Sequence, residues 1–312
     1  REMQHQFKSA GVRALVYLNM FGKRVQDVLE STPIDYLIEA KMGDMMPAAK
    51  GWITNLVVNK VKKLVPAYQL PQAIGFKSVL HKGGGQALRP VPVTLEDTAV
   101  LQYTGGTTGL PKGAMLTHRN LVANMQQIRA CLSQHDAQGQ PILQEGCEIM
   151  VAPLPLYHIY AFTANCMGMM VTGNHNLLIT NPRDIKGFIK ELKNWRFTAF
   201  LGLNTLFVAL MDHPDFKTLD FSGLKITNSG GTALVKATAD RWEQLTGCRI
   251  VEAYGLTETS PAASCNPCGA LARSGTVGTP VPGTAMKVID DLGTDLGLGE
   301  RGGFRRVIGI LD

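Results

Sequence analysis

The stretch at residues 103–120 reads YTGGTTGLPKGAMLTHRN and gathers glycine, threonine and one lysine directly behind the apolar run AVLQ. Small residues let backbone N–H groups approach an anion closely, and threonine hydroxyls and Lys112 add further donors. We therefore predict a phosphate-binding loop. The general template G-x-x-x-x-G-K-[ST] does not fit, because Pro111 precedes the lysine and Gly113 follows it, which argues against a Walker-type kinase or ATPase. A solvated glycine and threonine turn is the structural alternative.

Three further stretches carry polar residues directly after an apolar run, and in the first two a helical pattern follows. PLPLYHIYAF at 153–162 contains His158, for which a packed aromatic cluster is the alternative role. NSGGTALV at 228–235 offers exposed backbone that can lie against a planar ligand or an anion. EAYGLTETSP at 252–261 begins with Glu252 in the apolar run, and the loop that follows contains one carboxylate, Glu258. A carboxylate near a polyphosphate indicates Mg²⁺.

Alternating apolar runs and helical patterns must position these residues. Strand, helix and strand repeated in this order predict an α/β fold, with parallel sheets layered with helices and ligands bound at the carboxyl ends of the strands. The predicted strands are 14–18, 35–40, 98–103, 149–154, 176–180, 197–202, 224–229 and 249–254, and the predicted helices are 1–9, 120–133, 161–171, 185–195, 205–212 and 235–246. The Gly- and Pro-rich texture from residue 275 predicts the start of a small β subdomain, and HKGGGQALRPVP at 81–92 an exposed linker.

The composition indicates the class of protein and argues against some partners. The chain has 312 residues, of which 45% are hydrophobic and 18% charged, and this balance is typical of a globular protein of about two domains. The net charge of +6 is dispersed, so we expect no nucleic-acid partner. The six cysteines lie mostly in apolar segments, as reduced thiols usually do. Cys265 and Cys268 have CxxC spacing without a second Cys or His pair nearby, so we predict no zinc site.

Together, YTGGTTGLPKGAMLTHRN and YGLTE resemble the two signatures of the acyl-adenylate-forming superfamily, which includes acyl-CoA ligases, luciferase and peptide-synthetase adenylation domains. LQYTGGTTG, LPLYHIYAF, NLLITNPRDI and LDFSGL are most similar to bacterial long-chain fatty-acid–CoA ligases. The resemblance implies the large N-terminal domain of such an enzyme, which forms acyl-CoA, AMP and pyrophosphate from a long-chain fatty acid, ATP and CoA through an acyl-adenylate.

The resemblance also implies a role for each matching residue. The catalytic set is His158 beside the acyl carboxylate, with Thr257 and Glu258 on the α-phosphate side, and Glu258 with Thr107 holds Mg²⁺. The adenine would lie between the central glycine element and Tyr254. The residues implied to bind the nucleotide are Tyr103, Thr104, Gly105, Gly106, Thr107, Thr108, Gly109, Lys112, Gly230, Gly231, Thr232, Tyr254 and Gly255.

Two departures from the superfamily pattern qualify this transfer. Thr232 stands where the family often has a third glycine, and family-like sequence ceases near residue 302, which a reading-frame shift would explain. We expect a chain truncated at both ends, with a partial first α/β subdomain at 1–95, a nucleotide- and acyl-binding subdomain at 96–274, the start of the β subdomain at 275–312 and no lysine-bearing C-terminal domain. The alternatives are an inactive ATP- and acyl-binding product and a ligase for another carboxylic acid; we expect the chain as given not to complete the ligase reaction.

Residues 45–68, MMPAAKGWITNLVVNKVKKLVPAY, have a helical pattern with a basic and an apolar side. Trp52, Ile53 and Leu56 share the apolar side, whereas Lys50, Lys60, Lys62 and Lys63 lie elsewhere, a pattern that suits the surface of an anionic membrane. A helix packed on the sheet is the alternative. No apolar run reaches the ~18 residues of a membrane span, so we expect a cytoplasmic protein, peripheral on the inner membrane if this helix binds lipid. A homodimer is one alternative for the oligomeric state of the protein.

Overall fold

The structure is a computed structural model of the whole chain, and it describes residues 1–105, 109–135, 139–268, 272–297 and 299–300. The chain divides into two compact units. Unit 1 comprises residues 1–94 and 103–114, and unit 2 comprises residues 95–102 and 115–312.

Unit 1 contains a small parallel sheet in the order β1-β2-β3, in which Val16 pairs with Ile38 and Ile38 with Ile74. The core of this sheet is formed by Tyr17, Val25 and Leu37, which are buried. Its elements are α1 (Glu2–Ser9), β1 (Ala14–Leu18), η1 (Asn19–Phe21), α2 (Gly22–Leu29), β2 (Tyr36–Ala40), α3 (Ala48–Leu56), η2 (Val57–Val61), β3 (Ile74–Gly75) and α4 (Phe76–Gly84). The expected linker at 81–92 therefore begins inside α4; all of its residues are exposed, as predicted, and those after Gly84 belong to no helix or strand.

Helix α3 continues as the π-helical turn η2, and only a narrow side of it, with Gly51 and Val58, is buried. Gly51 approaches Gly43 so closely that a Cβ atom on Gly51 would lie 2.3 Å from the Gly43 carbonyl oxygen. The Gly43 amide donates to Asn55 Oδ1 at 2.9 Å, on the same side. The opposite side, with Trp52 and Ile53, is exposed to 67% and 54%. The predicted apolar side of this helix thus faces away from the residues on which the helix packs within unit 1.

Strands β4 (Thr98–Thr104) and β5 (Lys112–Thr117) pair with each other in a separate sheet. They flank the centre of the predicted phosphate-binding stretch, residues 105–111, and themselves take up its first two residues and residues 112–117. The prediction that residues 103–120 form one long loop is wrong for 112–117, which are strand. The alternating exposure of β5 explains the difference, because Leu116 is buried while Met115 is exposed.

Within the described residues, unit 2 holds a large sheet of seven strands in the order β12-β11-β10-β9-β8-β6-β7. Strands β6 to β10 are mutually parallel, whereas β11 and β12 add antiparallel strands at one edge. The strands are β6 (Ile149–Ala152), β7 (His175–Leu178), β8 (Ala199–Gly202), β9 (Ile226–Ser229), β10 (Ile250–Gly255), β11 (Ala262–Cys265) and β12 (Thr279–Pro280). The predicted α/β fold with parallel sheets is confirmed.

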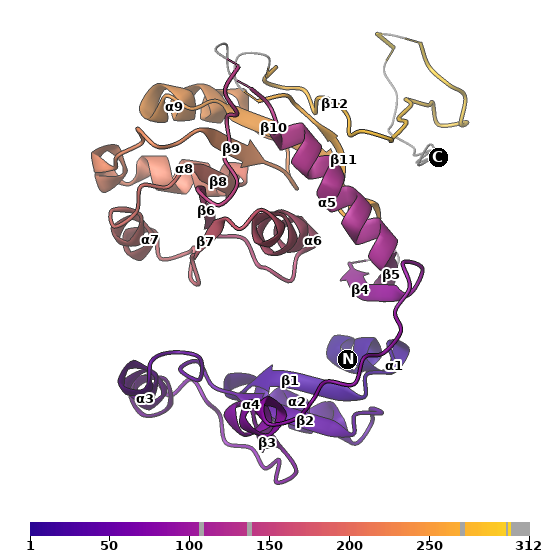
Figure 1. Cartoon of the computed structure of the whole chain (residues 1–312), viewed down its shortest axis with the longest axis vertical. Helices are drawn as coiled ribbons and strands as arrows, with labels where there is room; N and C mark the ends of the chain where they lie inside the picture. The colour runs from indigo at the N-terminus through magenta and orange to yellow at the C-terminus, as the bar shows by residue number, and fades with distance from the viewer. Residues whose placement is uncertain (106–108, 136–138, 269–271, 298, 301–312) are drawn as a thin grey trace. The chain divides into compact units, whose positions relative to one another are not determined.

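Helices cover both faces of the large sheet (Figure 1), with α7, α8 and α9 on one face and α5 and α6 on the other. Local signals explain several helix ends: the Thr117 hydroxyl caps α5 by accepting from the Asn120 amide, and Gly247 ends α9 with a φ of 71°. The elements are α5 (His118–Leu132), α6 (Ile159–Ala161), η3 (Phe162–Met169), α7 (Ile185–Leu192), α8 (Asn204–Asp212), η4 (Pro214–Thr218), α9 (Lys236–Thr246) and η5 (Thr257–Thr259).

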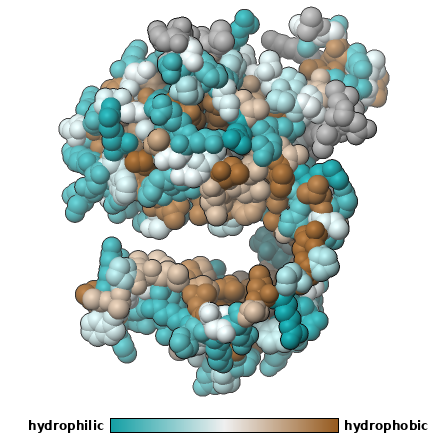
Figure 2. Space-filling model, in the orientation of Figure 1, coloured by the Kyte–Doolittle hydropathy of each residue, from teal (hydrophilic) through white to brown (hydrophobic). Residues whose placement is uncertain are grey.

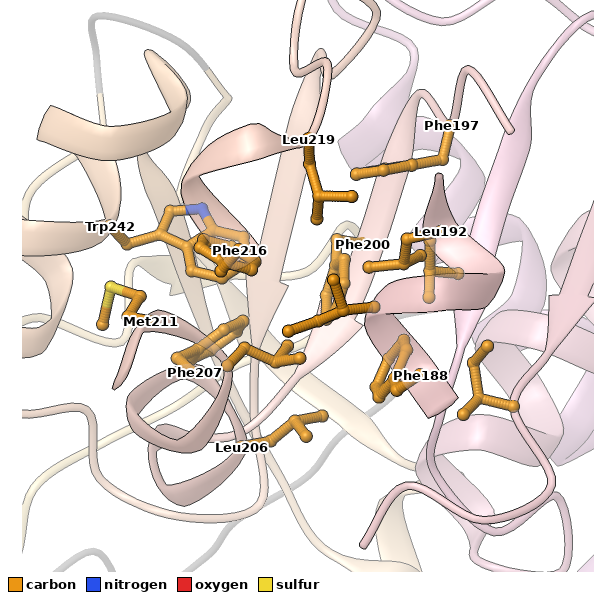
Figure 3. Packing of buried hydrophobic residues seen from close by; sticks show 14 of the residues in the cluster. Phe188, Leu192, Phe197, Phe200, Leu206, Phe207, Met211, Phe216, Leu219 and Trp242 are labelled. Atoms are coloured by element: carbon orange, nitrogen blue, oxygen red, sulfur yellow. The ribbon is translucent and has the colours of Figure 1, made fainter. Parts of the chain in front are cut away.

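The main core lies between the sheet and the face formed by α7, α8 and α9. It is strongly aromatic (Figure 3): Phe207 and Trp242 have ring centroids 4.7 Å apart, and Phe200 lies 5.4 Å from Trp242. The Trp242 indole N–H donates to Thr227 Oγ1 at 3.1 Å, so its one polar group is satisfied in the core. Because side chains alternate along a strand, Val151 points into this core while Met150 points to the other face.

None of the helices in the described parts of the chain combines the length and the apolar character that a membrane-spanning helix requires.

Candidate active site

The second face of the large sheet contains a cavity of about 320 Å³, lined by residues of unit 2 alone. Its wall is mainly apolar, with Met150 and Leu201 from the strands and Met125, Ile128 and Leu132 from α5. The cavity lies where the chain reverses its direction across the sheet: β7 adds on one side of β6, and β8 adds on the other. Open parallel sheets bind their ligands at such a point, outside the carboxyl ends of the strands. The order of strands therefore marks the same place as the cavity.

The cavity brings together six of the residues that the sequence singled out. They come from the ends of three strands that are separate in sequence, as expected for parallel strands whose carboxyl ends share one edge. These six are His158, Gly230, Gly231, Tyr254, Gly255 and Thr257. Thr232 and Glu258 follow directly in sequence but do not line the cavity, and both are exposed.

Each of the three glycines lies where a side chain could not be added freely. A Cβ atom on Gly230 would lie 3.1 Å from Cζ of Tyr160, and one on Gly255 would lie 2.0 Å from the Pro261 carbonyl oxygen. Gly231 has a φ of +79°, which disfavours residues with a side chain. The glycines thus let backbone form part of the cavity wall.

Tyr160 is a site residue that sequence reasoning missed. Its hydroxyl donates to Oδ1 of Asn228, whose amide nitrogen donates to the Val251 carbonyl at 3.0 Å. Burial, with a contribution from Cys265, raises the pKa of Tyr160 well above its usual range, so the phenol stays a proton donor at neutral pH. Tyr160 lies in the quoted stretch 153–162, but only the contact with Asn228, 68 residues later, reveals its role.

The turn after β10 has a fixed shape. The Leu256 amide donates to Thr259 Oγ1 at 2.9 Å, and the Thr259 hydroxyl in turn donates to the Leu256 carbonyl at 2.9 Å. The turn η5 follows, so Thr257 faces the cavity and the carboxylate of Glu258 is exposed beside it. This is a strand end that presents one hydroxyl and one carboxylate together.

The described side chains of the site suit Mg²⁺ that is bound together with a nucleotide. Among the described residues, no group of three His, Cys, Asp or Glu side chains could hold a metal ion by itself. Mg²⁺ bound with a nucleotide needs only one or two protein carboxylates, because phosphates and water complete its shell. Glu258 suits this mode. Thr107, the second expected ligand, lies outside the described residues.

The phosphate-binding stretch has its own geometry within unit 1. The Tyr103 hydroxyl donates to the Gln6 carbonyl at 3.2 Å, and the Thr104 hydroxyl contacts the Lys112 carbonyl at 3.5 Å. Gly105 is exposed, and Gly109 has a φ of +120°. The Lys112 ammonium is exposed on β5. Gly106, Thr107 and Thr108 were predicted to bind phosphate and lie outside the described residues.

Strand-end loops of parallel strands that converge on one mainly apolar cavity, with glycine backbone in its wall, define an α/β domain with a cavity at the carboxyl ends of its strands. The chain belongs to the family of AMP-binding enzymes, whose profile matches residues 1–304. This result confirms the resemblance found in the sequence.

Curated relatives narrow the comparison. The chain is 45% identical over 302 residues to the long-chain-fatty-acid–CoA ligase of Salmonella typhimurium, covering 97% of this chain and 53% of that protein. It is 46% identical to the enzyme of the same name from Yersinia pestis, covering 97% and 52%. The chain thus spans about half the length of the curated relatives it matches.

Solved structures support the fold. The chain is similar to an anthranilate CoA ligase in complex with anthranoyl-AMP, with a TM-score of 0.77, 20% identity and coverage of 96% of this chain and 52% of that one. It is also similar to a long-chain-fatty-acid-CoA ligase from Archaeoglobus fulgidus, with a TM-score of 0.71, 23% identity and coverage of 96% and 55%.

Proposed function

We propose that the chain forms the nucleotide- and acyl-binding part of a long-chain fatty-acid–CoA ligase. The overall reaction joins a fatty acid to CoA, consumes ATP and releases AMP and pyrophosphate through an acyl-adenylate. The observation that carries this proposal is the cavity beside β6, where β7 and β8 add to the large sheet on opposite sides. Its lining combines apolar methionine and leucine side chains with the polar residues that follow the strand ends. An acyl chain needs the first feature and a phosphate ester the second.

The strand ends would divide the work of adenylation. Tyr254 and the backbone of Gly230, Gly231 and Thr232 would bind the adenine, with Gly255 leaving room beside it. His158 would lie next to the acyl carboxylate. Support comes from the common location of His158, the glycines and Tyr254 on the cavity wall. Attack of a carboxylate on the α-phosphorus requires two anions to be held in line, and fixed backbone and side-chain donors provide that order without a protein nucleophile.

Phosphate charge is the second requirement. We propose that Thr104, Gly105, Gly109 and Lys112, with Tyr103 at the strand end, bind the β- and γ-phosphates. Gly106, Thr107 and Thr108 complete this proposal from the sequence. Thr257 and Glu258 would face the α-phosphate, with Glu258 and Thr107 as the residues that hold Mg²⁺. When bound with ATP, Mg²⁺ neutralises charge on the phosphate oxygens.

The proposal extends to partners and to the organisation of the chain. CoA would be the second substrate, and the division at 1–95, 96–274 and 275–312 remains our proposal for the subdomains. We place the protein in the cytoplasm, with contact to an anionic membrane through the exposed side of α3. Apolar side chains lie at the surface of unit 1 in this region (Figure 2), and the lysines at 50, 60, 62 and 63 are exposed beside them. A homodimer is also part of this proposal.

The test is ATP–pyrophosphate exchange that depends on an added carboxylic acid. The full-length parent protein is assayed with saturated fatty acids of increasing chain length and with anthranilate and 4-coumarate as aromatic acids. We expect exchange to rise with chain length and to be weakest with the aromatic acids, because the cavity wall is apolar. Exchange that is fastest with an aromatic acid would favour the alternative, a ligase for another carboxylic acid. No exchange with any acid would contradict adenylation itself.

A further inference from the structure

Two cysteines from distant parts of the chain line the same cavity. Cys131 lies near the end of α5 and Cys265 at the end of β11, and both belong to the cavity wall. Neither is needed for the proposed ligase chemistry. Both are only partly buried and are free thiols. A small molecule that enters the cavity can therefore reach them.

Hydrogen bonds fix α5 against β11 on either side of this pair. The Asn124 side chain donates to the Ala262 carbonyl at 2.8 Å and accepts from the Ala262 amide at 3.0 Å. Beyond the helix end, the Cys268 amide donates to Gln134 Oε1 at 2.8 Å. The two segments thus run in the same direction, held at residues 124 and 262 and again at 134 and 268.

The spacing between these two attachments aligns the thiols. From Asn124 to Cys131, seven helical residues advance about 10.5 Å at ~1.5 Å each. From Ala262 to Cys265, three strand residues advance about 10 Å at ~3.3 Å each. The equal advance sets Cys131 opposite Cys265, and residues seven apart lie on one face of a helix.

The two thiols contact each other and differ in character. The interaction with the Cys265 thiol lowers the pKa of Cys131, while the interaction with Cys131 and burial raise the pKa of Cys265. Cys131 is therefore the better nucleophile, because the thiolate is the reactive form. Burial raises the pKa of the neighbouring Cys268 to about 11, which makes it a weaker competitor.

We propose that Cys131 and Cys265 are a site of reversible oxidation, at which a peroxide converts the pair to a disulfide across the cavity wall. The Cys131 thiolate attacks one oxygen of hydrogen peroxide, the O–O bond breaks, and a sulfenic acid and hydroxide form; the hydroxide takes up the proton that Cys131 has lost and becomes water. The Cys265 sulfur then attacks the sulfenic sulfur, the S–O bond breaks, and a second water leaves with the Cys265 proton. Two thiols lose two electrons, and the peroxide gains them.

A disulfide at this place would change the wall of the cavity in which the acyl chain is proposed to bind. Disulfides in a reducing compartment are usually transient and regulatory. A bond between Cys131 and Cys265 joins α5 to β11 across the cavity wall, and Tyr160 belongs to the same wall. Resting on the proposed function, we infer that oxidation reduces binding of the acyl chain, and that a thiol reductant restores it.

The first experiment needs no ligase activity. The protein is treated with hydrogen peroxide, the remaining thiols are alkylated, and the digest is analysed by mass spectrometry with and without reduction. We expect one linked peptide pair, containing Cys131 and Cys265, that has lost two hydrogen atoms and separates on reduction. Cys131→Ser and Cys265→Ser should each abolish the pair, whereas the control Cys147→Ser, on an exposed thiol, should retain it. Full alkylation of both cysteines after peroxide treatment would overturn the proposal, and so would a Cys265–Cys268 link in its place.

The second experiment measures binding of a fluorescent long-chain fatty acid before oxidation, after oxidation and after reduction. We expect a several-fold loss of affinity on oxidation that reduction reverses and that Cys131→Ser does not show. If the linked peptide forms and affinity stays unchanged, the regulatory part of the inference fails while the modification site stands. If the reduced protein binds no fatty acid at all, the proposed function fails instead.

Discussion

The ring of Tyr160 lies against the backbone of Gly230 and fills the space in which a side chain at residue 230 would stand. Tyr160 cannot move aside freely, because its hydroxyl is bonded to Asn228. We expect Gly230→Ala to force the ring out of place and to lower the free energy of unfolding by about 1–3 kcal/mol, the usual cost of overpacking. Urea unfolding measures this change.

Gly83→Ala is the matched control for this substitution. Gly83 lies in α4, and a Cβ atom there would meet nothing within 4 Å. Alanine in an open helical position should be neutral or stabilise by about 0.5–1 kcal/mol. Equal effects of the two substitutions would show that the contact between Tyr160 and Gly230 is not restrictive.

Glu148 gives the protein a predictable response to acid. Its side chain is buried, accepts from the Gln144 amide at 2.6 Å and pairs with the Lys225 ammonium at 2.7 Å. Burial alone would raise the pKa of Glu148, but these hydrogen bonds lower it below its ordinary value. A lowered pKa stabilises the fold above the ordinary carboxyl pKa of about 4.3, and the contribution is lost as pH falls through the folded value. We expect the unfolding free energy to fall more steeply below about pH 5 in the wild type than in Glu148→Gln.

Lys225→Met tests the same pair from the other side at neutral pH. It leaves a buried carboxylate without its cation, and we expect a loss of about 1–3 kcal/mol. Lys236→Met breaks an exposed pair with Asp240 and should cost less than about 1 kcal/mol. A cost for Lys225→Met as small as that of the control would contradict the importance of the buried pair.

Lys112 should contribute to ATP binding without contributing to stability. Its ammonium is exposed and has no hydrogen-bond or ion-pair partner among the described residues. A hydrogen bond from a charged donor to phosphate contributes about 1.5–3 kcal/mol, so we expect Lys112→Ala to weaken ATP binding by that amount in calorimetry. Lys82→Ala, on the exposed end of α4, is the control and should bind ATP as the wild type does. Unchanged binding in Lys112→Ala would remove this stretch from the phosphate site.

The exposed side of α3 should direct the protein to anionic vesicles. Each lysine near such a surface contributes about 1 kcal/mol, so changing Lys60, Lys62 and Lys63 to Glu should greatly reduce flotation with the vesicles. Trp52→Ala should reduce it as well, because the exposed indole supplies apolar contact. The control changes three exposed lysines on or next to α7, Lys186, Lys190 and Lys193, to Glu. Equal losses in both triple variants would indicate a general charge effect and no specific contact by α3.

Sequence patterns predicted the five parallel strands of the large sheet, β6 to β10, for a physical reason, whereas the antiparallel edge strand β11 was not predicted. The strand predicted at 197–202 appears as β8, Ala199–Gly202, and all its residues are buried, because a parallel strand covered on both faces is apolar throughout. β5 was missed, since its glycine and threonine content resembles a turn. The helix predicted at 161–171 contains the π-helical segment η3, which lines the cavity with Ala164, Gly168 and Met169; such segments often occur at functional sites, and no local sequence signal announces them.

The candidate site was predictable where it depends on strand ends and unpredictable where it depends on distant contacts. His158, Gly230 and Tyr254 each follow an apolar run, so parallel strands bring them to one edge. The pairing of Tyr160 with Asn228 and of Cys131 with Cys265 joins residues far apart in sequence. Such contacts are set by the order of strands in the sheet and by the packing of α5, which composition and periodicity do not specify.

The aromatic core around Trp242 supplies a built-in optical reporter. Trp242 is fully buried among phenylalanines in unit 2, whereas Trp52 is 67% exposed in unit 1. A buried indole emits at shorter wavelength and is shielded from a dissolved quencher such as acrylamide, whereas an exposed indole is quenched readily. Intrinsic fluorescence that resists the quencher therefore follows the integrity of the sheet that carries the cavity, and the quenchable fraction comes from Trp52 together with the half-buried third tryptophan, Trp195.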